Sequence, residues 1–224
     1  MNWETEKEKF YDFIIENKVI GFYKEPVLLK SGRESPFYVN WRNISEDVYL
    51  TDKLTDYLLS YIKYLQLVPD CFFGVPEGAT KLGIITQFKW ARKNRNYKPG
   101  IFKLSMGRGK PKNHGEIKDR FYLGIPNGKV VILEDVTTTG GSLIQCIEDL
   151  QKLNVNVISA IGLTNRNEIR DDGKTVKQLV SEKGVKYFAM SNIIEILPKL
   201  NPNKEIALLI ENYFKKFGVR QIEL

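Results

Sequence analysis

Cysteine and histidine are nearly absent from this chain of 224 residues, which has two cysteines and one histidine. Cys71 and Cys146 each lie in an apolar stretch, and neither has a second Cys or a His nearby at metal-ligand spacing. We therefore expect two buried small hydrophobic residues rather than a disulfide or a zinc site. This usage fits a reducing compartment.

Long apolar runs are also lacking. No stretch approaches the roughly 18 apolar residues of a membrane span, and the start of the chain, MNWETEKEKF, is too charged for a signal peptide. We expect a cytoplasmic protein without a membrane partner. Hydrophobic residues make up 42% of the chain and charged residues 27%, which excludes a disordered protein. The length favours a single domain over residues 1–224.

Acidic residues are outnumbered by basic ones. The 34 Lys and Arg against 27 Asp and Glu give a net charge of +7, which suits an anionic partner. Most of these cations are interleaved with acids, as on the exposed faces of helices. The exception is the acid-poor segment Lys103–His114, which also contains Gly107 and Gly109. This distribution favours a loop that binds a small anion over a surface that binds nucleic acid.

The spacing of apolar residues predicts two helices, at 3–17 and 52–65, and then a sheet. From residue 69 onward, short apolar strands alternate with helical segments. This alternation predicts an α/β fold with a mostly parallel sheet covered by helices on both faces, with its core at 66–190. The expected strands are Cys71–Val75, Ile101–Leu104, Val130–Leu133, Val157–Leu163 and Tyr187–Ala189, and the helices are Ala79–Lys89, Ser142–Leu153, Thr175–Glu182 and Lys204–Phe217.

One strand-to-helix turn has the composition of a phosphate site. After Val130–Leu133 come two acids and then a run of Thr, Gly and Ser. Glycines let backbone N–H groups approach a phosphate, hydroxyls add donors, and a helix N-terminus favours negative charge. The acids could accept hydrogen bonds from sugar hydroxyls, so the pattern indicates a ribose next to its 5′-phosphate. The alternative is a turn that merely caps a helix; neither a Walker loop nor a GxGxxG motif is present.

The stretch VVILEDVTTTGGS resembles the donor-binding fingerprint of type I phosphoribosyltransferases. The resemblance implies the fold of that family and a site for phosphoribosyl pyrophosphate (PRPP). It also implies Mg²⁺ as a cofactor, held mainly by PRPP and water, and we assign it no direct protein ligand. Asp135 would lie near the positive charge that develops on the sugar. The implied PRPP-binding residues of this stretch are Glu134 and Asp135 on the ribose hydroxyls, Val136, and Thr137, Thr138, Thr139, Gly140, Gly141 and Ser142 around the phosphate.

A second turn, Pro76–Ala79, occupies the position of the family's pyrophosphate loop. Small residues there permit close backbone approach, so Glu77 and Gly78 are expected PRPP-binding residues. The carboxylate of Glu77 would have to point away from the phosphates or toward the metal. An ordinary strand-to-helix turn is the alternative.

The segment Leu29–Asn40, LKSGRESPFYVN, resembles the LKSGRxSPYFxN stretch of orotate phosphoribosyltransferases. Its lysine and aromatic pair could clamp a planar anionic ring. As ordinary structure, Ser-Gly-Arg would be a turn and Phe37 a core residue. The resemblance implies a small N-terminal hood over about 1–45, with Lys30 near the pyrophosphate and the base. Tyr38 and Val39 would pack on the base, although an aromatic residue is often found at position 39.

Arg166, just after an expected strand, matches the arginine with which this family grips orotate. The alternative is an exposed loop arginine. Thr138 is the remaining expected contact of the base. A purine-type phosphoribosyltransferase would keep the donor site but not the LKSGRESP segment or Arg166. A non-catalytic PRPP-sensing regulator is the alternative from another class, and no helix-turn-helix signal precedes the sheet to support it.

The basic segment Arg108–Gly115, RGKPKNHG, resembles the catalytic loop RKxxKxHG of the same family. The resemblance implies that Arg108, Lys112 and His114 bind PRPP at its departing pyrophosphate and are catalytic together with Asp135. Gly109 stands where relatives commonly have lysine, and Lys110 follows one position later. In the family this loop reaches the site of the neighbouring subunit, which implies a homodimer with shared sites. A lone histidine is otherwise usually structural or merely exposed.

Overall fold

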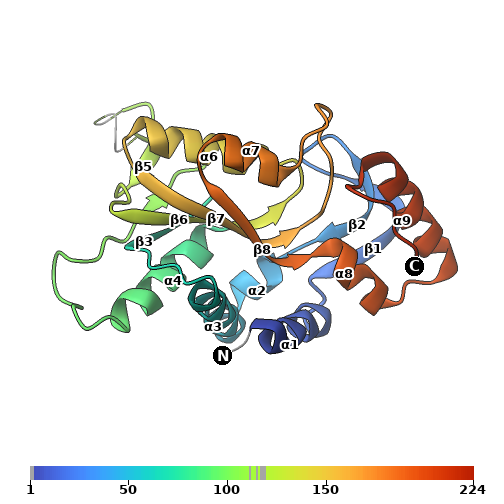
Figure 1. Cartoon of the computed structure of the whole chain (residues 1–224), viewed down its shortest axis with the longest axis horizontal. Helices are drawn as coiled ribbons and strands as arrows, with labels where there is room; N and C mark the ends of the chain where they lie inside the picture. The colour runs from blue at the N-terminus through green and yellow to red at the C-terminus, as the bar shows by residue number, and fades with distance from the viewer. Residues whose placement is uncertain (1–2, 111, 115, 117–119) are drawn as a thin grey trace.

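A four-stranded parallel sheet forms the centre of the computed structural model, which describes residues 3–110, 112–114, 116 and 120–224 (Figure 1). Two residues of the expected basic loop, Pro111 and Gly115, lie outside the described residues. The strands stand in the order β3-β6-β7-β8, which confirms the predicted α/β fold. They are β3 (Cys71–Gly74), β6 (Lys129–Thr137), β7 (Asn156–Asn165) and β8 (Lys186–Asn192).

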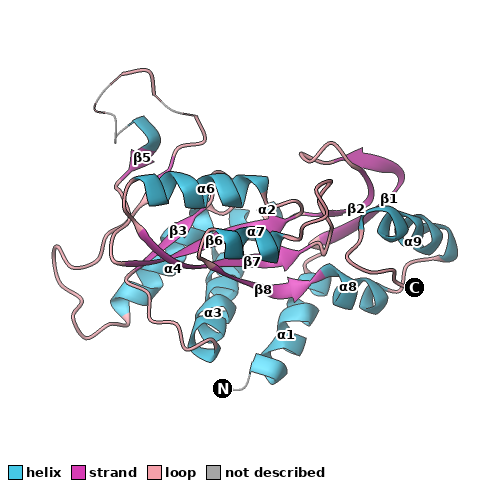
Figure 2. Ribbon diagram, turned by 45° about the horizontal axis from the view of Figure 1, so that its top comes forward, coloured by secondary structure: helices cyan, strands magenta, loops and turns pink. Residues whose placement is uncertain are grey.

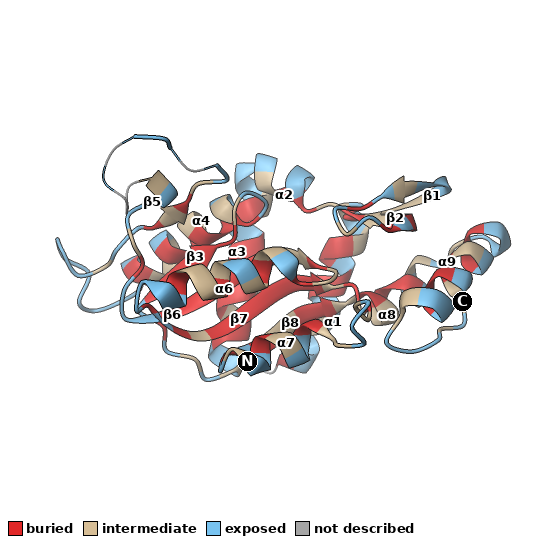
Figure 3. Cartoon of the chain, turned by 90° about the horizontal axis from the view of Figure 1, so that it is seen from above, coloured by how far each residue is buried: buried red, intermediate tan, exposed pale blue. Residues whose placement is uncertain are grey.

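Alternate residues of each strand enter two separate apolar cores. Val131 and Leu133 of β6 pack in one core and Val130 and Ile132 in the other, and all four are fully buried. Successive strand side chains point to opposite faces, so a strand covered on both sides reads as a continuous apolar run. Buried residues accordingly follow the whole sheet in Figure 3.

Helices cover both faces of the sheet. The first core is closed by α1 (Trp3–Glu16), α3 (Val48–Tyr64), α8 (Ile193–Ile196), the 3₁₀ helix η1 (Leu197–Leu200) and part of α4 (Thr80–Arg92). The second is closed by α6 (Gly141–Lys152) and α7 (Val176–Glu182). The capping box at the start of α7, where Thr175 and Gln178 bond each other's backbone N–H, fixes the position at which that helix begins. No helix in the described part of the chain is long and apolar enough to span a bilayer.

A separate antiparallel hairpin, β1 (Ile20–Leu28) and β2 (Glu34–Val39), forms a hood at one end of the sheet (Figure 1). Helix α9 (Lys204–Phe217), from the other end of the chain, packs against both strands. Phe37 is fully buried there and stacks on Phe214 with ring centroids 6.0 Å apart, which confirms its interpretation as a core residue. Of the segment 1–45, α1 packs against α3 and β8, and the short α2 (Arg42–Glu46) packs against α3.

The predicted strand Ile101–Leu104 is wrong. These residues form a turn and irregular backbone, and the side chains of Ile101 and Leu104 are about half exposed. The side-chain amide of Gln87 in α4 donates to the Lys103 carbonyl at 2.8 Å. A helix side chain therefore bonds this carbonyl, as the backbone of a neighbouring strand would do in a sheet. The chain then forms a small separate antiparallel pair, β4 (Met106–Gly107) and β5 (Tyr122–Leu123).

Buried ion pairs join the hood to the sheet. Glu168, which follows β7, accepts a hydrogen bond from Arg166 Nε at 2.7 Å and one from Arg33 Nη1 at 2.9 Å. Glu168 and Arg166 are each 1% exposed and Arg33 is 7% exposed. Both guanidinium groups also lie over aromatic rings, Arg166 over Phe37 at 4.0 Å and Arg33 over Phe217 at 4.5 Å. This network fixes how the hood sits on the sheet.

We predict that Glu168→Gln lowers the free energy of unfolding by about 3–5 kcal/mol, because it leaves two buried cations without their shared carboxylate. Urea unfolding curves at neutral pH measure the loss. The control is Glu8→Gln, which removes an exposed ion pair with Lys199 and should cost less than about 1 kcal/mol. Similar small losses in the two variants would show that the network contributes little.

Candidate active site

The loop between β6 and α6 lies at the carboxyl edge of the parallel sheet, where ligands bind in folds of this kind. Gly140 ends the loop with φ +74°, a left-handed conformation that favours glycine. A Cβ at this position would lie 3.2 Å from both methyl groups of Val176, so a side chain would also have to displace Val176 slightly. Thr138 and Thr139 are half-buried and Gly141 is exposed. The loop is therefore accessible along this part of its length.

Lys30 of the hood reaches the start of α6, directly after this loop. Its Nζ donates a hydrogen bond to Ser142 Oγ at 2.8 Å, although the two residues are far apart in the sequence. Its charge also acts on Glu134, whose pKa it lowers against the larger effects of burial and Asp135. The structure thus brings together the hood lysine and the loop that we had predicted separately.

The two acids after the β6 core residues differ in their surroundings. Glu134 is 7% exposed, and burial, reinforced by the neighbouring carboxylate of Asp135, raises its pKa well above its ordinary value. Asp135 is half-buried, and its Oδ1 accepts the N–H of Val136 at 2.8 Å. The pair places one carboxyl group that resists ionisation beside a second, more accessible one.

One further loop lies against Asp135, and a second loop lies against the first. A Cβ on Gly78 would collide with the Asp135 carboxylate, so the turn after β3 lies directly against it. A Cβ on Gly109 would in turn collide with the Glu77 carboxylate. The expected pyrophosphate turn and the base of the basic loop therefore meet beside the acids.

The basic loop continues the β4–β5 pair outward. Arg108 N donates to the Phe121 carbonyl at 2.8 Å and Lys112 N to the Arg120 carbonyl at 3.0 Å. Arg108 is half-buried, whereas Lys112 and His114 are exposed. The described part of this ribbon projects from the body of the molecule (Figure 2). Lys112 and His114 are therefore exposed on an extension of the β4–β5 pair.

The expected base-binding residues differ in how far they are buried. Tyr38 is half-buried on β2, but Val39 faces the apolar core and is 5% exposed. Arg166 is not the exposed loop arginine of the alternative interpretation, since it is among the most buried side chains. Its guanidinium donates to Glu168 and, at 2.8 Å, to Ser35 Oγ. Its contact with a base stays a prediction.

The hydroxyl of Thr137 corrects one detail of the predicted phosphate loop. Thr137 is 1% exposed, and its Oγ1 lies 2.5 Å from the hydroxyl of Tyr187 on β8. Its side chain therefore supports the loop from the core instead of offering a hydroxyl to phosphate. Burial raises the pKa of Tyr187, which keeps that hydroxyl protonated. We had not predicted a role for Tyr187, and its place inside an apolar strand run gave no signal of one.

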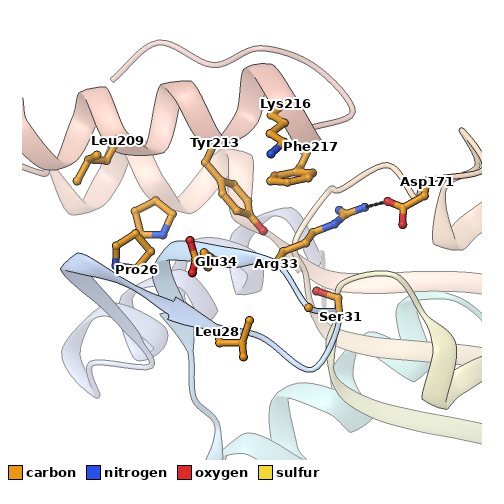
Figure 4. A pocket seen from close by; sticks show the side chains of 12 residues that line it. Pro26, Leu28, Ser31, Arg33, Glu34, Asp171, Leu209, Tyr213, Lys216 and Phe217 are labelled. Carbon is orange, nitrogen blue, oxygen red and sulfur yellow. Dashed lines mark hydrogen bonds and ion pairs between the residues drawn. The ribbon is translucent and has the colours of Figure 1, made fainter.

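A cavity of about 560 Å³ lies between the hood and α9 (Figure 4). Leu28 and Arg33 of the hood segment face Tyr213 and Phe217 of α9 across it. None of the expected PRPP-binding residues lines this cavity. Within the described ranges, no three His, Cys, Asp or Glu side chains are grouped so that they could hold a metal by themselves.

A solved structure with this architecture is the orotate phosphoribosyltransferase of Francisella tularensis. It matches with a TM-score of 0.68 and 21% sequence identity, over 94% of this chain and 99% of that one. The shared fold and the loop between β6 and α6 define a type I phosphoribosyltransferase fold.

Comparison with known sequences identifies the family within this fold. The orotate phosphoribosyltransferase of Methanosphaera stadtmanae is 30% identical over 72% of this chain and 83% of that protein. The one from Clostridium botulinum (strain Alaska E43 / Type E3) is 28% identical over 97% of this chain and 100% of that protein. No family model matches the chain. The chain belongs to the orotate phosphoribosyltransferase family, which confirms the resemblance inferred from its motifs.

The raised pKa of Glu134 predicts a pH dependence of stability in the substrate-free protein. The raised pKa means that the folded state favours the neutral form of Glu134. The resulting contribution to the free energy of unfolding is fully present below the pKa of Glu in the unfolded chain, about 4.3, and is lost as pH rises through the pKa of Glu134 in the folded protein. We expect the unfolding free energy of the wild type, relative to Glu134→Gln, to fall by up to about 1.4 kcal/mol per pH unit across that window.

Urea unfolding of both proteins at intervals from about pH 5 to about pH 8 measures this difference. The exposed carboxyl of Glu223, changed to Gln in the same way, provides the control. A difference between wild type and Glu134→Gln that stays constant over this range would contradict the assignment.

Proposed function

We propose that the protein transfers the 5-phosphoribosyl group of PRPP to a ring nitrogen of orotate, giving orotidine 5′-monophosphate and diphosphate in pyrimidine biosynthesis. The observation that carries this proposal is the hydrogen bond of 2.8 Å from Lys30 to Ser142. It joins the segment that resembles an orotate site to the loop that resembles a PRPP site. The family membership of the chain supports the same acceptor.

The donor would bind along the carboxyl edge of the sheet. Backbone N–H groups of Thr138–Ser142 and the start of α6 would hold the 5′-phosphate, with Lys30 adding its charge. Glu134 and Asp135 would accept hydrogen bonds from the ribose hydroxyls. Hydrogen bonds to a carboxylate favour its ionised form, so ribose binding would offset part of the burial that raises the pKa of Glu134.

Catalysis would rest on fixed charges. As the bond from ribose C1 to pyrophosphate breaks, negative charge grows on the leaving group and positive charge on the sugar. Arg108, Lys112 and His114 would stabilise the pyrophosphate, and Asp135 would lie near the sugar cation. The basic loop, placed over the bound donor, would exclude water that could hydrolyse it.

Magnesium fits the site as part of the donor complex. Adjacent carboxylates offer the oxygen ligands that Mg²⁺ prefers, but the described residues contain no grouping able to hold a metal alone. We propose that PRPP and water supply most of its ligands, near Glu134 and Asp135. When bound, Mg²⁺ would neutralise charge on the pyrophosphate and ease its departure.

We also propose a homodimer whose active sites are shared. Lys112 and His114 are exposed on a ribbon that projects from the body of the molecule, while its base contacts the pyrophosphate turn (Figure 2). A second subunit would allow these cations to reach a phosphate loop. The family resemblance of the loop supports this arrangement.

Turnover with different bases tests the acceptor. The protein is incubated with PRPP and Mg²⁺, and orotate, adenine, hypoxanthine, guanine and xanthine are supplied separately while pyrophosphate and nucleotide are measured. We expect turnover with orotate alone. Turnover only with a purine would overturn the assignment, and PRPP binding without turnover would favour a sensor.

Lys112→Ala tests the role of the basic loop. We expect kcat to fall by about 100-fold, as for the loss of one group that stabilises developing charge, with a much smaller change in orotate binding. Lys110→Ala removes a cation from the same loop and should cost far less. Comparable losses in turnover and orotate binding for Lys112→Ala would contradict its role.

The same variant tests site sharing. A mixed dimer of Lys112→Ala with Asp135→Asn has one site with both defects and one with neither, if the loop acts on the partner's site. Part of the activity should return when the two inactive proteins are mixed. No recovery in dimers shown to be mixed would count against sharing.

A further inference from the structure

The segment between β7 and α7 supports the phosphate loop from behind at successive points. Arg166 N donates to the Thr137 carbonyl at 2.9 Å. Arg170 Nη1 donates to the Thr139 carbonyl, also at 2.9 Å. Val176, the first residue of α7, lies so close to Gly140 that a Cβ there would be 3.2 Å from its methyl groups. The carbonyls on this side of the loop are therefore turned toward the β7–α7 segment.

The bond from Arg170 determines the direction of the next amide. The peptide between Thr139 and Gly140 is trans, and in a trans peptide the C=O and N–H bonds point in opposite directions. With the Thr139 carbonyl held by Arg170, the Gly140 N–H points to the other side of the loop. A phosphate loop requires its N–H groups on the ligand side and its carbonyls away from it.

Arg170 is itself held in place. Its Nε donates to Asp172 Oδ2 at 3.3 Å, and its backbone N–H and C=O bond to Lys174 and Gly173 in a tight turn. A guanidinium fixed in this way loses little freedom when it binds a carbonyl, and its charge strengthens the bond. The positive charge also lies behind the loop, on the side away from the proposed phosphate.

We propose that Arg170 is a positioning residue for the donor: it sets the Thr139–Gly140 peptide so that the Gly140 N–H faces the 5′-phosphate. This inference rests on the proposed function, because it assigns the phosphate to this loop. Its effect is specific to the donor, since the contact of Arg170 is with the phosphate loop. Loss of Arg170 should therefore weaken binding of the phosphoribosyl group while the acceptor is affected much less.

Binding of ribose 5-phosphate, measured by calorimetry on the intact protein, tests this inference without turnover. We expect Arg170→Met to raise its Kd and the KM for PRPP by about tenfold, the scale of one charge-assisted hydrogen bond. The KM for orotate should change less than about twofold by comparison. Arg170→Lys, which keeps the charge and a donor, should recover part of the loss. Lys174→Met removes a cation from the same turn and should bind ribose 5-phosphate as the wild type does.

Urea unfolding curves identify any variant that fails to fold. If Arg170→Met does not fold, the comparison of ribose 5-phosphate binding between Arg170→Lys and the wild type tests the inference. Unchanged ribose 5-phosphate binding in a folded Arg170→Met, or equal changes in both KM values, would overturn the role of Arg170 while the wild type still converts orotate. A wild type that neither binds ribose 5-phosphate nor uses PRPP would overturn the proposed function, and this inference with it.

Discussion

Glu168 lies buried between two arginines, Arg33 of the hood and Arg166 at the end of β7. A buried charge is costly unless it is paired, so moving any one of the three side chains would break a buried ion pair. Arg33 follows Lys30 in the same tight turn, and Lys30 contacts Ser142 at the start of α6. The Glu168 carboxylate thus helps to set the orientation of the hood, the reach of Lys30 and the seating of Arg166, and the Asp171 carboxylate adds a second bond to Arg33 at 3.0 Å.

Glycine occurs where the loops of the site meet. Gly78 lies against Asp135, Gly109 against Glu77, and Gly140 against Val176. At each of these contacts a Cβ would press on a neighbouring group. The close approach of loops from β3, β4 and β6 concentrates carboxylates, basic groups and backbone amides in one place. Such a fixed arrangement can stabilise charge separation without reorganising as the reaction proceeds.

Gly109 departs from the motif of the basic loop, and its surroundings in the structure explain why a glycine fits there. The motif that this segment resembles has lysine at this position, but here the space a side chain would enter holds the carboxylate of Glu77. The turn after β3 and the basic loop of this chain are therefore in close contact. Val39 has a different explanation: its side chain packs in the apolar core, so a base could be stacked on the hood only by its neighbours, such as the half-buried Tyr38.

Local sequence pattern predicted the sheet, most of its helices and the strand-to-helix turn between β6 and α6, because apolar periodicity and turn composition act over a few residues. It failed at 101–104, where the Gln87 side chain takes the place of a strand. Only the tertiary structure decided that Thr137 bonds Tyr187, that Arg166 is buried against Glu168, and that Arg170 holds the Thr139 carbonyl. These contacts join separate elements, so they depend on how strands and loops are placed and not on the preferences of neighbouring residues.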